Sequence, residues 1–176
     1  GEEINYRRFF DINDLAAIRT ETPEVFQATH RLVLQLVAEG RITGLRVDYP
    51  DGLRDPAGYF RQLQQSQLGR DADTGSSGNE RPLYIVAEKI LSKGEALPTD
   101  WAVLGTTGYD FLNQVNGLFV RRARRGAMDK IYGDFIGAKS NYRELVNSRK
   151  KMIMLVSLAS EINALSHRLD NISERN

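Results

Sequence analysis

Residues 42–56 read Ile42-Thr-Gly-Leu-Arg-Val-Asp48-Tyr-Pro-Asp-Gly52-Leu-Arg-Asp-Pro56, and this stretch decides the expected fold. Its first part, Ile42 to Val47, is short and rich in β-forming residues, which predicts a strand that ends at Asp48. Turn-forming residues follow at positions 50–52. Asp55 and Pro56 are typical of the cap and the first position of a helix. The stretch therefore predicts a strand, a turn and the start of a helix.

The same alternation extends on both sides of this stretch. Before it, apolar residues recur at helical spacing from Pro23 to Glu39, with Thr22 as the expected cap and Gly40 as the expected stop. After it, a short apolar run from Leu83 to Ala87 ends at Glu88. The order helix, strand, helix, strand is typical of a parallel sheet with crossover helices. We therefore expect an α/β fold.

The second half of the chain has a different pattern, which predicts helices at Tyr109–Val120 and Arg124–Ile136 and a long one from a cap at Ser140 to about Leu169. The long helix is expected to bury a stripe of apolar residues. These are Leu145, Met152, Ile153, Val156, Ala159, Ile162, Leu165 and Leu169. We expect two domains, an α/β segment at residues 1–105 and a helical subdomain at residues 106–176. The polar stretch Gly69–Glu80 is interpreted as a mobile surface loop.

Composition narrows the classes of function. The 176 residues are 41% hydrophobic and 27% charged, as in a globular domain that buries a core. The formal net charge of +1 gives no overall field that would attract nucleic acid or an acidic membrane. The longest apolar run, Met152–Ala159, is too short to span a bilayer. No secretory signal core is recognised at the start, so we expect a cytoplasmic protein.

The chemistry available to the side chains is also limited. The sequence has no cysteine, which excludes disulfides, thiolate metal sites and thiol catalysis. The only two histidines, His30 and His167, lie in helical patterns and are poorly placed for a serine triad or a histidine zinc site. Acid and base chemistry must therefore fall mainly to carboxylates.

Two carboxylates stand where chemistry is expected. Asp48 and Glu88 follow the two predicted strands, and in parallel α/β folds that edge of the sheet holds the active site. Retaining glycoside chemistry uses such a pair, one as nucleophile and one as acid and base. Arg46 points to the same side of its strand as Asp48 and can keep that carboxylate charged, whereas a less polar setting can keep Glu88 protonated. An acid at a strand end is also often a helix cap or a solvated loop residue.

Several stretches of the sequence resemble those of a known protein family. Gly44-Leu-Arg-Val-Asp48-Tyr-Pro-Asp-Gly-Leu-Arg-Asp-Pro-Ala-Gly58 and Val86-Ala-Glu88-Lys-Ile-Leu91 resemble the second and third signature regions of the α-amylase clan. Within this clan the chain is similar to the maltooligosyltrehalose synthase family. Further stretches that carry the likeness are Ile4-Asn-Tyr-Arg-Arg-Phe-Phe-Asp-Ile-Asn-Asp-Leu15, Gly94-Glu-Ala-Leu-Pro98, Gly105-Thr-Thr-Gly-Tyr-Asp-Phe-Leu-Asn113, and Ser148-Arg-Lys-Lys-Met-Ile-Met154 with Leu158-Ala-Ser-Glu-Ile-Asn163.

This resemblance implies a retaining intramolecular transglycosylase. Such an enzyme converts the reducing-end α-1,4 bond of a maltooligosaccharide to an α,α-1,1 bond, without a cofactor. It implies that Asp48 is the nucleophile and Glu88 the acid and base, with Arg46 as the residue that orients Asp48. The residues expected to contact substrate are Tyr49, Asp51, Thr107, Tyr109 and Asp110.

The chain departs from the family pattern in three respects. Tyr49 stands where the family has a histidine. The clan's third catalytic carboxylate has no convincing counterpart after Glu88, and its first signature region would lie before Gly1. A whole barrel takes about 250 residues. We therefore expect a partial (β/α)-barrel, an excised middle portion of a longer enzyme, that is inactive alone and associates with itself through unpaired strand edges.

Other readings remain open. An α-amylase-type hydrolase would carry the same pair of carboxylates. A non-catalytic carbohydrate-binding or scaffold piece would have neither transglycosylase nor hydrolase activity. The basic cluster Arg121–Arg125 lacks interleaved aromatic residues and is interpreted as a solvated helix junction. Gly105–Gly108 lacks the Gly-Lys-Ser/Thr sequence of a phosphate-binding loop, so no nucleotide is expected.

Overall fold

The computed structural model describes residues 4–68, 82–138 and 141–175. By its contacts the chain divides into two units, one of residues 18–120 and one that combines residues 1–17 with residues 121–176. The first unit includes the helix that follows residue 108, which the sequence analysis assigned to the helical subdomain. The expected domain boundary between residues 105 and 106 stays a prediction.

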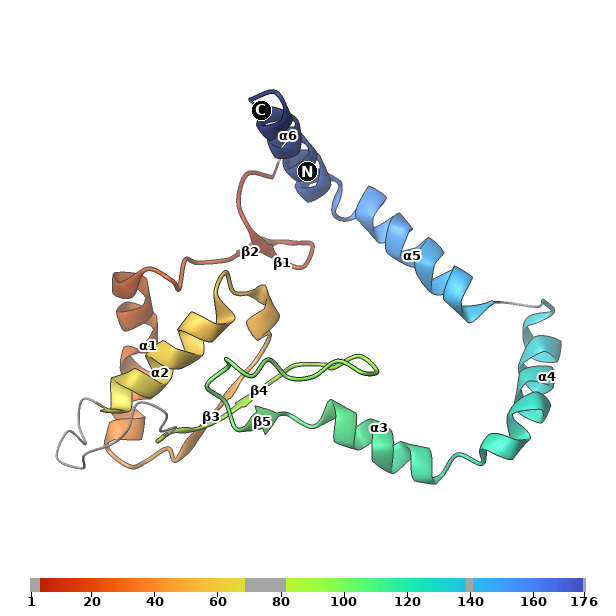
Figure 1. The fold of residues 1–176 in the computed structure, drawn as a ribbon, viewed down its shortest axis with the longest axis horizontal. Coiled ribbons are helices and arrows are strands. Elements are labelled where there is room, and N and C mark those ends of the chain that lie inside the picture. Colours follow the sequence, from red (N-terminus) through yellow and green to blue (C-terminus); the bar gives the residue numbers. More distant parts are fainter. Residues whose placement is uncertain (1–3, 69–81, 139–140, 176) are drawn as a thin grey trace. The chain divides into compact units, whose positions relative to one another are not determined.

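The unit of residues 18–120 is built on a parallel three-stranded sheet. Its strands are β3 (Gly44–Val47), β4 (Tyr84–Ala87) and β5 (Gly105–Thr106), with β4 between the other two. In the register, Gly44 pairs with Tyr84 and Val47 with Ala87, while Val86 pairs with Gly105. The helices α1 (Pro23–Ala38) and α2 (Pro56–Leu68) lie before and after β3 in the chain (Figure 1). The expected α/β fold and its parallel sheet are confirmed.

Local sequence signals explain where these helices begin and end. Pro23 is the first residue of α1, and Gly40 adopts a left-handed backbone (φ 67°) just after it, which a glycine adopts without strain. The Asp55 side chain accepts a hydrogen bond from the backbone N–H of Gly58 at 2.8 Å and so caps α2, as predicted. Thr22 precedes α1 but makes no side-chain capping bond.

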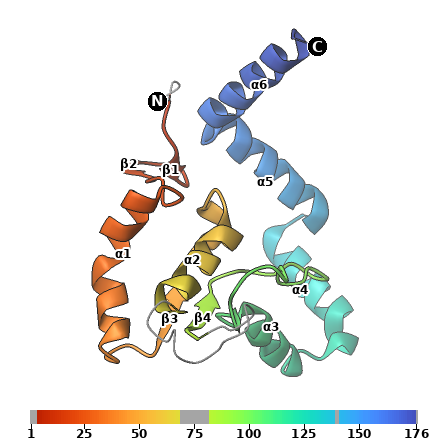
Figure 2. The ribbon, with the colours of Figure 1, turned by 60° about the vertical axis from the view of Figure 1, so that its left-hand side comes forward.

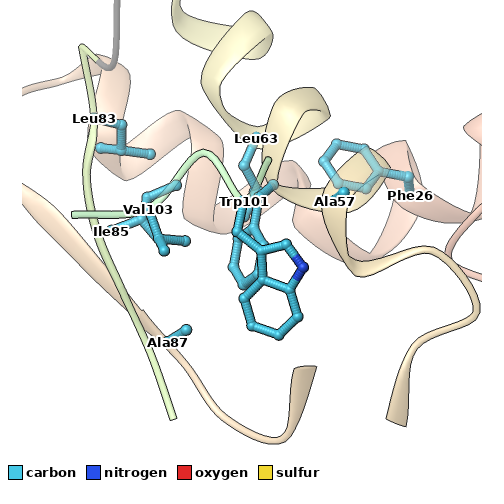
Figure 3. Close-up of a cluster of buried hydrophobic side chains, with 9 residues drawn as sticks. Phe26, Ala57, Leu63, Leu83, Ile85, Ala87, Trp101 and Val103 are labelled. Carbon is cyan, nitrogen blue, oxygen red and sulfur yellow. The ribbon is translucent and has the colours of Figure 1, made fainter. Parts of the chain in front are cut away.

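The core of this unit lies between the sheet and the two helices (Figure 3). Phe60 and Trp101 pack ring against ring, with centroids 5.2 Å apart. Gln64 is buried with them, and its amide pairs with the backbone N–H and C=O of Leu83 and with the C=O of Ala102. The buried apolar residues are Phe26, Ala57, Phe60, Leu63, Leu83, Ile85, Ala87, Trp101 and Val103.

Two shorter elements complete this unit. A single turn of 3-10 helix, η1 (Pro50–Gly52), follows β3. Helix α3 (Tyr109–Leu118) follows β5 and starts after Gly108, whose backbone is left-handed (φ 95°). Both elements start at the end of the sheet where the candidate carboxylates stand.

The other unit consists of a small hairpin and helices. The hairpin joins β1 (Arg8–Phe9) to β2 (Ile12–Ala16) in antiparallel fashion. The helical elements are η2 (Arg122–Arg124), α4 (Arg125–Ile136), α5 (Tyr142–Val156) and α6 (Ala159–Ser173). Arg8 ties the hairpin to the last two helices, because its guanidinium contacts Glu161 at 2.8 Å and the C=O of Ser157 at 2.6 Å.

The prediction of one long C-terminal helix was wrong. The structure has two, α5 and α6, which meet at a bend near Ser157 (Figure 2). The C=O of Ile153 accepts hydrogen bonds from the N–H groups of both Ser157 and Leu158, which ends the regular ladder there. The guanidinium of Arg8 donates a hydrogen bond to the C=O of Ser157, so this carbonyl has a partner although it lies outside both helices. The observed side-chain cap of α5 is Asn141, which accepts from Arg143, and the expected cap Ser140 lies outside the described residues.

The predicted buried stripe of the last helices was also wrong. Six of its eight members are exposed by 43% or more, up to 73% for Val156. Periodicity indicated helical structure correctly, but burial needs a partner surface as well. In the same way Leu32, which belongs to the apolar pattern of α1, is 66% exposed.

The predicted loop at Gly69–Glu80 lies outside the described residues. Within the described ranges, no helix is long and apolar enough to cross a bilayer.

Candidate active site

The two candidate catalytic carboxylates follow neighbouring strands. Since Val47 pairs with Ala87 in the parallel register of β3 and β4, the next residues, Asp48 and Glu88, leave the sheet at the same edge. A backbone hydrogen bond of 2.8 Å from Glu88 N to Val47 O continues the ladder one step further. The prediction that both acids stand on one edge of adjacent parallel strands is confirmed.

A single guanidinium links the two carboxylates. The Nε of Arg46 donates to Oδ1 of Asp48 at 2.6 Å, and its Nη2 lies 3.7 Å from Oε1 of Glu88. The hydrogen bond with Asp48 raises the pKa of Arg46 above its ordinary value, so this side chain stays cationic. The expected contact of Arg46 with Asp48 is present, and the contact with Glu88 was not foreseen.

Glu88 is held through both of its carboxylate oxygens. The hydroxyl of Tyr109 donates to Oε1 at 3.1 Å, and the backbone N–H of Tyr49 donates to Oε2 at 3.2 Å. The side chain of Glu88 is 26% exposed, whereas that of Asp48 is 63% exposed. Glu88 is thus more enclosed than Asp48, but its contacts are a hydroxyl, a backbone N–H and a guanidinium, so the less polar setting expected for it is not observed.

The residue after Asp48 has an unusual backbone. Tyr49 is left-handed (φ 51°, ψ 49°), a conformation that costs a non-glycine residue on the order of 1–3 kcal/mol. The ring of Tyr49 lies against Gly52, where a Cβ atom would come within 2.4 Å of its Cε1. Pro50, between them, is buried. The left-handed backbone thus directs the N–H of Tyr49 toward Glu88. Tyr49 contacts the site through its backbone.

The turn is also held by an ion pair that the sequence analysis missed. Lys89 Nζ donates to both carboxylate oxygens of Asp51, at 3.1 and 3.0 Å, and lies 3.2 Å from Oε1 of Glu95. Asp51, expected to contact substrate, is therefore paired within the protein. The signal available in the sequence was the basic residue next to Glu88.

The remaining predicted substrate contacts lie at the start of α3. Thr107 donates its backbone N–H to Ala87 O at 3.0 Å, which brings this segment beside the strand that carries Glu88. The Oγ1 of Thr107 is buried and has no hydrogen-bond partner in the described part of the chain. Asp110 accepts from Thr106 Oγ1 at 3.0 Å and so belongs to the turn that starts the helix. Among Thr107, Tyr109 and Asp110, Tyr109 is the residue whose side chain contacts a catalytic candidate, Glu88.

A metal centre has no obvious donors in this structure. Across residues 4–68, 82–138 and 141–175, no group of three or more His, Cys, Asp or Glu side chains is arranged to hold an ion. The described site therefore offers a pair of carboxylates, one arginine and one tyrosine hydroxyl. Such a set suits nucleophilic and acid–base chemistry at a sugar carbon.

Comparison with known proteins gives the site a context. No family model matches the chain. A protein of Mycobacterium tuberculosis named as a maltooligosyl trehalose synthase is 44% identical over 115 residues, which are 65% of this chain and 14% of that protein. The chain therefore spans about a seventh of the length of the curated relatives it matches.

Solved structures agree over more of the chain. The maltooligosyltrehalose synthase of Arthrobacter ramosus matches 94% of this chain and 20% of its own, with 39% identity and a TM-score of 0.81. A protein of Sulfolobus tokodaii named as a maltooligosyl trehalose synthase matches 94% of this chain and 20% of its own, with 36% identity and a TM-score of 0.76. The family resemblance found in the sequence is confirmed, and it covers one segment of these relatives.

Proposed function

Since this chain matches one segment of the maltooligosyltrehalose synthases in sequence and in fold, we propose that it carries two catalytic carboxylates of such an enzyme. The proposed reaction moves the glycosyl group of a maltooligosaccharide from O4 to O1 of the terminal glucose. The observation that carries the proposal is the pair Asp48 and Glu88 at one sheet edge, both in reach of Arg46.

The first half of the reaction breaks the α-1,4 bond. Asp48 attacks the anomeric carbon and forms a glycosyl ester, while Glu88 gives its proton to the departing O4 of the terminal glucose. Arg46 holds Asp48 in its ionised form and in one orientation through the 2.6 Å contact. Tyr109 and the N–H of Tyr49 fix the direction of the Glu88 carboxyl group.

The second half forms the α,α-1,1 bond. The freed glucose turns so that its anomeric hydroxyl attacks the carbon held by Asp48. Glu88, now a carboxylate, takes the proton of that hydroxyl, and Asp48 leaves as a carboxylate. Both residues end the cycle in the state in which they began it. The intermediate must be kept from water, which favours an enclosed site.

We also propose that the sheet of β3, β4 and β5 is part of a (β/α)-barrel of the α-amylase type. The parallel register and the acids at the carboxyl ends of β3 and β4 support this proposal. Tyr49, Asp51, Thr107 and Asp110 are proposed to lie near the bound sugar. The third carboxylate of the clan would then come from residues beyond this segment.

The test is a product assay with a full-length synthase that carries this segment. Incubation with maltopentaose should lower the number of reducing ends as trehalosyl product forms. A rise in reducing ends would instead indicate an α-amylase-type hydrolase. If Asp48→Asn changed neither turnover nor the affinity for maltopentaose, the segment would be a non-catalytic binding piece.

A further inference from the structure

One enclosed cation stands beside the proposed catalytic pair and takes no part in the steps above. Lys89 directly follows Glu88, and its side chain is only 11% exposed. Its Nζ is shared between Asp51, at 3.0 and 3.1 Å, and Glu95, at 3.2 Å. The bonds to these two carboxylates are charge-assisted and favour this position of the ammonium group. Lys89 thus joins the turn after β3 to the loop after β4.

The core of the unit supports the position of this lysine. Its Nζ lies 5.8 Å from the centroid of the Trp101 ring, within the range of a cation–π contact. Trp101 is 7% exposed and packs on Phe60 of α2. The cation is therefore anchored to a rigid part of the molecule, and the partners that bind it are held there too.

The loop after β4 is closed around the same cation. Glu95 accepts a hydrogen bond from the backbone N–H of Ser92 at 2.9 Å through one oxygen and contacts Lys89 through the other. The bond from Ser92 and the bond from Lys89 lower the pKa of Glu95, and the bond to Asp51 raises the pKa of Lys89. Both partners therefore stay charged around neutral pH.

The other partner, Asp51, controls the backbone next to the site. Asp51 lies in η1, two residues after Tyr49, whose left-handed backbone sends its N–H to Oε2 of Glu88 at 3.2 Å. Such a conformation of a non-glycine residue persists only when its surroundings hold it. The bond between Lys89 and Asp51 is one of the contacts that stabilise this conformation. Lys89 is therefore linked to the carboxylate of Glu88 by its ion pair with Asp51, by the short backbone segment from Asp51 back to Tyr49, and by the hydrogen bond from the N–H of Tyr49.

The geometry points to Lys89 as a positioning residue that fixes the orientation of Glu88 by holding the turn of Tyr49 and Asp51. This inference rests on the proposed function, in which Glu88 is the acid and base. Lys89 contacts none of the reacting atoms in it. It acts on the rate of the chemical steps and leaves the binding of the oligosaccharide largely unchanged.

The experiment compares single variants of a full-length synthase that carries this segment. Lys89→Met keeps the length of the side chain and its packing on Trp101 but removes the charge, and Lys89→Arg keeps the charge. Lys93→Met is the matched control, an exposed lysine in the same loop. We measure kcat and KM with maltopentaose, and circular dichroism reports the fold. Since a shift of about 1 Å can cost about 10²-fold, Lys89→Met should lower kcat by about 10- to 100-fold and change KM less than about 3-fold.

Each outcome decides between the alternatives. Lys89→Arg should recover most of the lost kcat, and Lys93→Met should match the unsubstituted enzyme. A folded Lys89→Met enzyme within about twofold of normal kcat would overturn the inference. If Lys89→Met does not fold, Asp51→Asn decides instead. A fall in kcat supports positioning, whereas a rise in KM alone shows that Asp51 binds sugar and contradicts it.

A failure of the proposed function would be seen in a different measurement, the analysis of the products. If the unsubstituted enzyme releases only reducing sugars, trehalosyl transfer is wrong, and the role of Lys89 is still read from the rate of bond cleavage.

Discussion

The helix α2 and strand β4 of one unit and the helices α4, α5 and α6 of the other carry clear apolar patterns but bury them very differently. In residues 18–120 the apolar faces of α2 and β4 meet, and Phe60, Leu63 and Ile85 are fully buried. In the helices α4, α5 and α6, large apolar side chains such as Phe135, Leu155 and Val156 are 73–87% exposed. A helical period therefore defines a face, and only a second surface turns that face into a core.

This difference in burial separates the residues around the candidate site from the exposed apolar residues of the other unit. The catalytic candidates and their partners stand on the unit that has its own core, where a sheet and the helix α2 hold them. The helices of the other unit present apolar surface of the kind that contacts other protein. The relatives of this chain are a little under five times as long, and we expect further residues of such an enzyme to cover these helices. Self-association of the isolated chain through unpaired strand edges stays a prediction.

The largest effect should follow from changing a catalytic candidate, which alters chemistry and not packing. In a full-length synthase carrying this segment, Asp48→Asn or Glu88→Gln should reduce kcat by at least about 10²- to 10⁴-fold, since general acid–base catalysis alone supplies that much. Both side chains lie at the edge of the core, so circular dichroism and the melting temperature should stay unchanged. An Asp48→Asn enzyme that kept a tenth of normal kcat would remove this residue from the mechanism.

A matched pair of phenylalanines tests the contrast between the units. Phe60→Ala should lower the free energy of unfolding by about 3–5 kcal/mol, because it leaves a cavity beside Trp101. Phe135→Ala, at a position 87% exposed, should change it by less than about 0.5 kcal/mol. Urea unfolding of the 176-residue chain measures both, followed by the fluorescence of its single tryptophan for Phe60→Ala and by far-ultraviolet circular dichroism for Phe135→Ala. Equal losses in the two variants would contradict the description of the units.

A pair of glutamines sharpens the comparison for polar groups. Gln64→Met leaves the N–H and C=O of Leu83 and the C=O of Ala102 without this partner, which should cost roughly 2–4 kcal/mol. Gln65→Met, at an exposed position of the same helix, is the control and should be nearly neutral. The same tryptophan signal applies, and a neutral Gln64→Met would show that the buried amide does not hold α2 to β4.

The smallest effect is expected in the helical unit and depends on pH. The hydrogen bond from Arg8 lowers the pKa of Glu161 below its ordinary 4.5. The contact therefore contributes fully above that value and is lost as pH falls through the lowered value in the folded state. Solvent screening keeps the contribution small.

Hydrogen exchange at the amide of Ile4, which donates to Ser160 on α6, reports this contact locally. Glu161→Gln should speed the exchange at pH 7 and have no effect at a pH below the lowered pKa of Glu161, where this residue is protonated in either state. Glu174→Gln, an exposed residue after the same helix, is the control. An effect of Glu161→Gln that persists unchanged at low pH would contradict the role of the ion pair.

Most of the α/β unit could be predicted from the sequence because its signals are local. Asp55 before Pro56 marked the start of α2, and the apolar runs before Asp48 and Glu88 marked two strands whose parallel pairing then put both acids on one edge. Arg46 was found because alternation along a strand puts positions 46 and 48 on the same side. These inferences need only neighbouring residues.

The rest depended on contacts between distant residues. Lys89 binds Asp51, 38 positions earlier, and Tyr109 reaches back 21 positions to Glu88. The bend between α5 and α6 is stabilised by Arg8, 149 positions before Ser157. No local pattern carries such pairings, because they are set by how the chain folds back on itself. The left-handed backbone of Tyr49 was equally hidden, since a tyrosine rarely adopts it.

The most direct measurement identifies the atom that holds the sugar. A full-length synthase with Glu88→Gln, treated with α-maltosyl fluoride, should form the glycosyl ester, because fluoride leaves without an acid, and should release it slowly because no base remains. Trypsin then yields the peptide Val47–Arg54, which contains both Asp48 and Asp51. Fragmentation of this peptide by mass spectrometry should locate the sugar on Asp48. A sugar on Asp51, or no sugar on this peptide while the enzyme still consumes the fluoride, would contradict the account.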